Sequence, residues 1–189
     1  MAITTRAIAA WVTSPAEPAG IPRIDETFAV ANKFAGTDGG AGLPFLPVGS
    51  MVKFWNPLYG DGEFIYLYGV AATAIGNMVT YNPVTGLTTL APNTANLDQP
   101  VAIAMVANTV TTNLAWYQVS GVATILKNAT AVSPSVPVYL SSTAGRVTPT
   151  ASAGKQVLNA RSVNAATAAA ATSTITALIQ RPFAQGQIT

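Results

Sequence analysis

The sequence predicts an all-β protein: a β-sandwich or barrel, jelly-roll-like, with about ten short strands and an extended N-terminal arm. From residue 51 onward, short runs rich in β-branched and aromatic residues recur at intervals of about ten residues. The stretches between them, such as YGDG, NPVTG and STAG, consist of residues that favour turns. No segment indicates a long helix with confidence, so a β fold is the best prediction.

The predicted strands follow one another along the second part of the chain, and each is bounded by turn residues. In chain order they are residues 51–55, 63–70, 78–82, 87–90, 101–107, 115–126, 136–140, 145–148, 156–163 and 174–180.

The run EFIYLYGV (63–70) has large apolar residues on both of its faces. Alternation places Phe64, Tyr66 and Tyr68 on one face and two aliphatic residues on the other. One interpretation is a central strand that is buried on both sides. The other is that the tyrosine face contacts a subunit or a partner, because tyrosine combines a large contact area with a polar tip.

Two positions interrupt this pattern. Gly121 lies within the run AWYQVSGVATIL, where glycine indicates a bulge or the close approach of another backbone. The segment NAATAAAATST (164–174) has enough alanine for a helical turn or two, but its threonines and its place between two strands favour a surface loop.

The first 50 residues differ in composition from the rest. They hold five prolines, most of the acidic residues and the run GTDGGAG at 36–42. Such a segment is predicted to be an extended arm (1–50) preceding a β domain (51–189). The arm either stays on its own subunit or lies over a neighbouring one, and the sequence leaves both alternatives open.

The composition disfavours catalysis. The chain has no histidine and no cysteine, so Ser-His-Asp, Cys-His and typical zinc sites are excluded. Asp61 and Glu63 are the closest pair of carboxylates, and they fall in a predicted turn. We therefore expect no catalytic, cofactor-binding or metal-binding residues and no cofactor. Only 8% of the residues are charged, against about 25% in typical soluble proteins, which favours a protein that packs against partners.

The charges are divided along the chain. The first 98 residues carry four cations and all seven acids, and the remainder carries five cations and no acid. Those cations are scattered and do not form the basic stripe of a nucleic-acid groove, so we expect them to be solvated or to face an acidic partner surface, and we expect no nucleic acid. No window of 18 uninterrupted apolar residues indicates a membrane span. The apolar run in the first twelve residues is too short and too polar for a signal peptide, so we expect no export by a cleaved signal.

Residues 51–186 carry a series of short motifs in a fixed order. They are Tyr59-Gly60 with Gly62-Glu63-Phe64, Trp116-Tyr117-Gln118 followed by Gly121, Ala144-Gly145-Arg146-Val147, Ala153-Gly154-Lys155-Gln156-Val157 leading to Ala160-Arg161, and the terminal stretch from Pro182 to Gly186. In this order they resemble the head decoration, or cement, proteins of tailed bacteriophages.

The resemblance implies a β-rich structural protein of the virion, made in the host cytoplasm and located on the capsid exterior. It would bind the outer surface of an icosahedral shell and reinforce contacts between major capsid subunits. Its partners would be the major capsid protein and itself, as a homotrimer or homodimer, with no membrane involved.

The contact residues expected on this basis are aromatic residues of the strands and cations of the acid-free part. They are Tyr66, Tyr68, Trp116, Arg146, Lys155, Arg161 and Arg181. The alternative function is a phage tail or fibre module that binds a carbohydrate or receptor, in which exposed tryptophan and tyrosine side chains would stack on sugars.

Overall fold

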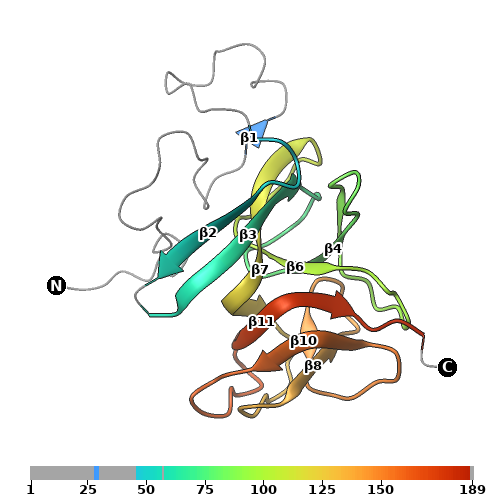
Figure 1. Ribbon diagram of the computed structural model, residues 1–189. Coiled ribbons are helices and arrows are strands. Elements are labelled where there is room, and N and C mark those ends of the chain that lie inside the picture. The colour runs from blue at the N-terminus through green and yellow to red at the C-terminus, as the bar shows by residue number, and fades with distance from the viewer. Residues whose placement is uncertain (1–27, 30–45, 57, 188–189) are drawn as a thin grey trace.

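The computed structural model describes residues 28–29, 46–56 and 58–187, and this part of the chain is all-β (Figure 1). All strand pairs are antiparallel. The strands are β1 (Phe28–Ala29), β2 (Met51–Asn56), β3 (Gly60–Tyr68), β4 (Met78–Tyr81), β5 (Thr88–Leu90), β6 (Val101–Ala104), β7 (Asn113–Leu126), β8 (Pro137–Leu140), β9 (Val147–Thr148), β10 (Gln156–Ser162) and β11 (Thr174–Ala184).

The predicted all-β fold class is confirmed, and each of the ten predicted runs forms a strand, β2 to β11. Strand β1 was not predicted, because two residues carry no pattern by themselves. Most of the predicted N-terminal arm lies outside the described residues. The arm, its two alternatives and the boundary at residue 50 therefore stay predictions.

Strand β7, with 14 residues, organises the sheet. Gln118 pairs with Phe64 of β3 and with Ile103 of β6, so these two strands lie on opposite edges of β7. The later part of β7 pairs with β11, from Ser120 to Leu126. The strand order is β5-β4-β6-β7-β11-β10-β8-β9, and β3, with β2 outside it, branches from β7.

Gly121 stands at the change of partners within β7. The ladder between β3 and β7 shifts register between Glu63 and Phe64, and Gly121 has a φ of +98°. A Cβ at this position would lie 2.5 Å from the carbonyl oxygen of Asp61. Of the two alternatives predicted for Gly121, the close backbone approach is therefore the one present at this residue, while the bulge lies just before it, at Val119.

The second half of β7 and strands β8 to β11 form the unit that we call the half-barrel, at the bottom of Figure 1. The sheet curls so that Lys127, just after β7, makes a parallel bridge with Val147 of β9. The Asn128 N–H donates to the Val147 carbonyl at 3.0 Å. The sequence left a sandwich and a barrel open, and the structure forms a single antiparallel sheet that curls into a half-barrel. Its core is aliphatic and includes Ala123, Ile125, Val138, Leu140, Val147, Val157, Ile175, Ala177 and Ile179.

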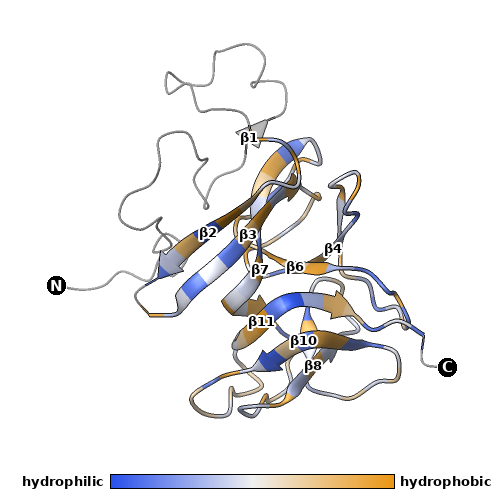
Figure 2. Cartoon of the chain, in the orientation of Figure 1, coloured by the Kyte–Doolittle hydropathy of each residue, from blue (hydrophilic) through white to orange (hydrophobic). Residues whose placement is uncertain are grey.

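We call β2, β3 and the first half of β7 the three-stranded half. One face packs the aromatic residues Phe54, Phe64, Tyr66 and Trp116, and the opposite face packs a mainly aliphatic cluster that includes Leu67 and the buried Tyr117. The run EFIYLYGV is thus buried on both sides, which confirms the first of its two interpretations. In β3 the hydrophilic residues lie in the first part of the strand and the hydrophobic ones in the later part (Figure 2).

The alanine-rich segment before β11 is a loop, as favoured from the sequence, with a single bridge between Ala168 and Val132. Within the described ranges, no helix is long and apolar enough to cross a membrane.

Candidate contact surfaces

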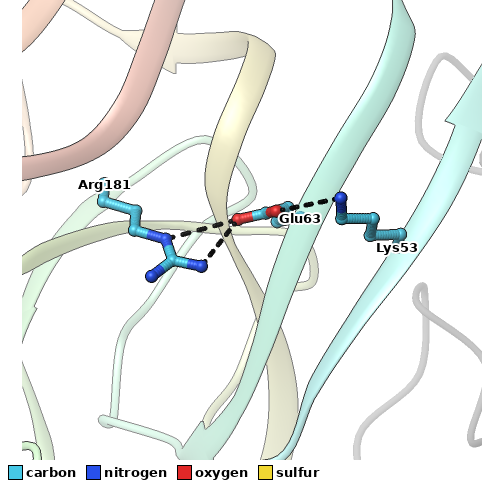
Figure 3. A network of polar contacts seen from close by, with 3 residues as sticks. All are labelled: Lys53, Glu63 and Arg181. Carbon is cyan, nitrogen blue, oxygen red and sulfur yellow. Dashed lines mark hydrogen bonds and ion pairs between the residues drawn. The ribbon is translucent and has the colours of Figure 1, made fainter.

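Three charged side chains meet where the half-barrel adjoins the three-stranded half (Figure 3). Arg181 of β11 donates from Nε and Nη2 to Glu63 Oε2 at 3.4 and 3.3 Å, and Lys53 Nζ of β2 lies 3.5 Å from Glu63 Oε1. The side chains of Lys53 and Arg181 are 75% and 70% exposed. Exposed pairs of this kind contribute at most about 1 kcal/mol, so the contact mainly orients the two cations.

The outer face of β2 presents apolar side chains to solvent beside this charged cluster. Met51 and Trp55 alternate with Lys53 on one face of the strand and are 45% and 44% exposed. Leu58, just after the strand, is 78% exposed. A shallow groove of about 200 Å³ runs here, lined by Met51, Val52, Lys53, Glu63 and Arg181.

Trp55 was not among the predicted contact residues. The run MVKFW contained the relevant pattern, because adjacent residues of a strand point to opposite faces and Phe54 and Trp55 therefore lie on different ones. Which of the two faces is exposed depends on what the rest of the sheet covers. The alternation alone therefore left the choice between them open.

A β-bulge interrupts the regular pairing of β10 with β11. Leu158 pairs with Phe183 and Ala160 with Ile179, so Asn159 alone faces three residues of β11. One of these is Pro182, which has no N–H to offer and therefore interrupts the ladder. Asn159 and Arg181 adopt positive φ angles of 57° and 47°, values that asparagine tolerates and arginine seldom adopts.

A second shallow groove, of about 220 Å³, lies at this bulge. We call it the bulge groove. It is lined by Asn159, Ala160, Arg161, Leu178 and Gln180. The guanidinium group and the two carboxamides supply hydrogen-bond donors, and the alanine and leucine supply an apolar surface.

Two of the four predicted contact cations are engaged within the chain. Arg146 Nη1 donates to the carbonyl oxygen of Lys127 at 3.1 Å, and Lys155 Nζ donates to Asn93 Oδ1 at 2.7 Å. With Arg181 held by Glu63, three of the four are oriented by intrachain acceptors.

Arg161 differs from these three cations. It is exposed, and its side chain makes no hydrogen bond or ion pair with any described residue. No carboxylate lies after Asp98 in the sequence. Arg161 is therefore the predicted contact cation whose full hydrogen-bonding capacity faces solvent.

The predicted aromatic contacts need correction. Tyr66 and Trp116 are 1% and 0% exposed, with ring centroids 4.9 Å apart. Burial also raises the pKa of Tyr66. Side chains with so little exposed surface stabilise the protomer and offer nothing for a partner to touch. Tyr68 is partly buried and packs against the same cluster.

Lys127 is the other departure from the sequence-based interpretation, which treated the later cations as solvated or facing a partner. It is 1% exposed, and its Nζ donates to the carbonyl oxygens of Asn128, Thr130 and Ala170 at 3.2, 3.0 and 3.4 Å. Desolvation lowers its pKa. The ammonium group ties the alanine-rich loop to the turn after β7 and is not part of an outer surface.

The carboxylates do not assemble into a metal site. No group of three or more His, Cys, Asp or Glu residues in the described part of the chain is placed to hold a metal ion. The turn predicted for Asp61 and Glu63 is wrong, because both residues lie in β3, and Glu63 is held between two cations. No protein-family model and no curated protein matches the sequence.

Proposed function

We propose that this protein is a structural component of a tailed-phage virion that binds the outer surface of the icosahedral capsid and reinforces contacts between major capsid subunits. The motifs of residues 51–186 support this through the resemblance that they carry. The observation that carries the proposal in physical terms is the charge of the second part of the chain, which has no acid and, besides the buried Lys127, four cations. Such a surface complements an acidic one and favours docking in a single orientation.

The mechanism is linkage by mass action. A ligand that binds the assembled shell, and not its separated subunits, stabilises the shell by RT ln(1 + [L]/Kd), which is about 2.7 kcal/mol per site at one hundred times the Kd. Many copies repeat this contribution over the shell. A homotrimer or homodimer would contact several capsid subunits at once, which adds the advantage of multivalency.

Two described surfaces offer the contacts that docking requires. The outer face of β2 supplies exposed apolar area through Met51, Trp55 and Leu58. The bulge groove supplies an available cation, Arg161. Apolar contact beside oriented charge is the usual composition of a protein interface.

The tail or fibre alternative requires exposed aromatic rings on which sugars stack. The burial of Tyr66 and Trp116 removes two of the expected platforms, and Trp55, which is 44% exposed, is the ring that this alternative would use.

The proposal is tested by mixing the purified protein with isolated capsid shells and, in parallel, with isolated tails, and then sedimenting each mixture. We expect saturable co-sedimentation with shells, no binding to tails, and a higher melting temperature of the decorated shells. Binding to tails alone would support the alternative. Absence from the shell pellet would refute the proposed function, and binding without a rise in melting temperature would refute the reinforcement mechanism.

A further inference from the structure

On the basis of the proposed function, we propose that the bulge groove is the site that receives a carboxylate side chain of the capsid surface, with Arg161 as the residue that anchors it. Asn159 and Gln180 line the same groove and provide further donors. The ligand class is thus an aspartate or glutamate on an exposed loop of the partner protein.

The backbone at the groove is held in an unusual form. Asn159 and Arg181 both have positive φ, and Pro182 prevents the regular ladder from continuing. A bulky non-glycine residue such as Arg181 persists in this conformation where the surrounding structure enforces it. Bulges of this type re-aim side chains and are over-represented beside functional sites.

The donors of the groove are available to a ligand. No described residue accepts a hydrogen bond from the side chain of Arg161, Asn159 or Gln180, and all three residues are exposed. By contrast, Arg181 is directed toward Glu63 by an ion pair that joins β11 to β3. The cation in the groove and the cation on its flank are therefore different in kind: one is free and the other is paired.

The chemistry of the groove fits a carboxylate side chain better than a nucleic-acid backbone. A guanidinium group forms two parallel hydrogen bonds to a carboxylate, and two carboxamides add donors around it. A nucleic-acid backbone would require a row of available cations, but Lys127 is buried and Arg146 and Lys155 are bound to intrachain acceptors. The apolar surface from Ala160 and Leu178 would exclude water and strengthen the ion pair on docking.

The test compares Arg161→Ala and Arg161→Glu with the matched control Lys155→Ala, which removes the same charge from another part of the surface. The readout is the dissociation constant for capsid shells, measured by co-sedimentation at low and at high salt. We expect Arg161→Ala to weaken binding by about tenfold or more, Arg161→Glu to weaken it further, and Lys155→Ala to change it by less than about threefold. Arg161 is exposed, so the melting temperatures of the Arg161 variants should match that of the wild type.

The outcomes separate the two proposals. If the wild-type protein does not bind shells, the proposed function fails, and this inference fails with it. If the wild type binds and Arg161→Ala binds equally well, the function stands and the bulge groove is not the contact. Equal weakening by Arg161→Ala and Lys155→Ala would mean that overall charge, and not this groove, drives docking, which also overturns the inference.

Discussion

The half-barrel and the three-stranded half share strand β7 but are filled with different side chains. The hydrophobic core of the half-barrel is built from aliphatic residues, with Met78 of β4 and Ile103 of β6 packed in the same cluster. The three-stranded half packs Phe54, Phe64, Tyr66 and Trp116 against one another on one face. Small side chains suit the narrow interior of a tightly curled sheet, whereas large rings cover an open sheet face.

The two regions also differ in charge. The three-stranded half contains Asp61 and Glu63, and the half-barrel contains cations without any acid. Curvature and charge thus change together at Gly121, where β7 exchanges β3 for β11 as its partner. One long strand can therefore connect a region specialised for internal packing to a region specialised for electrostatic contact.

The largest expected effect comes from breaking the aromatic core. The Trp116 ring lies 4.9 Å from that of Tyr66 and 6.3 Å from that of Phe54, measured between centroids. Trp116→Ala should lower the free energy of unfolding by about 3–5 kcal/mol, measured by urea denaturation. Trp116→Phe is the control and should lose less. A loss below about 1 kcal/mol for the alanine variant would contradict the structural role given to these rings.

The junction between the regions comes next. Gly121→Ala introduces a side chain at positive φ and against the Asp61 carbonyl. It should lower the free energy of unfolding, measured by thermal melting, by about 2–4 kcal/mol. Gly60→Ala is a matched control, because Gly60 also has a positive φ but a Cβ placed there would have no other atom within 4 Å. It should cost only about 1–2 kcal/mol in the same thermal melt. Equal costs would show that the close approach at Gly121 is unimportant.

Alkaline pH should weaken the three-stranded half through Tyr117. Burial raises the pKa of Tyr117 to about 12, while in the unfolded chain the pKa is about 10. Above pH 10 the unfolded state therefore binds fewer protons, and the stability present below pH 10 is lost as the pH rises toward 12. The loss amounts to about 2–3 kcal/mol.

Tyr117→Phe removes this titration and is the control for the alkaline experiment. Its free energy of unfolding, measured by urea denaturation from pH 9 to 12, should fall less steeply than that of the wild type. Lys127 acts in the opposite sense, because desolvation lowers its pKa and stability then rises with pH. Since Lys127 is present in both proteins, the difference between them isolates Tyr117, and parallel curves would contradict the prediction.

The smallest effect is expected at the contact between the regions. Glu63→Gln removes the partner of Lys53 and Arg181, and should lower stability by no more than about 1 kcal/mol, with the difference vanishing at high salt. Asp61→Asn changes the charge equally and serves as the control in the same thermal melts. A loss of several kcal/mol would mean that this network holds the two regions together.

The sequence allowed the strands to be located, but not their partners. Alternation and turn residues are local, so the runs that form β2 to β11 were predictable. The branch at β7 and the bridge from Lys127 to Val147 depend on contacts between distant segments. A pattern within a single run carries no information about them.

The same limit applies to the contact residues. Arg161 and Arg181 look alike in the sequence, and what distinguishes them is Glu63, which lies 118 positions from Arg181. The burial of Lys127 could not be foreseen, because its acceptors are backbone carbonyls, which every residue has. The burial of Trp116 could not be foreseen either, because it is decided by the other strands that pack around it.

The acid-free composition of strands β6 to β11 has a consequence for how the protein would respond to its surroundings. The chain has no histidine, and the ionisable side chains after Asp98 are lysines, arginines and tyrosines. Histidine is the side chain whose ordinary pKa puts its charge change near neutral pH. Because this region contains none, we expect any sensitivity of docking to pH between mildly acidic and mildly alkaline conditions to come from the partner.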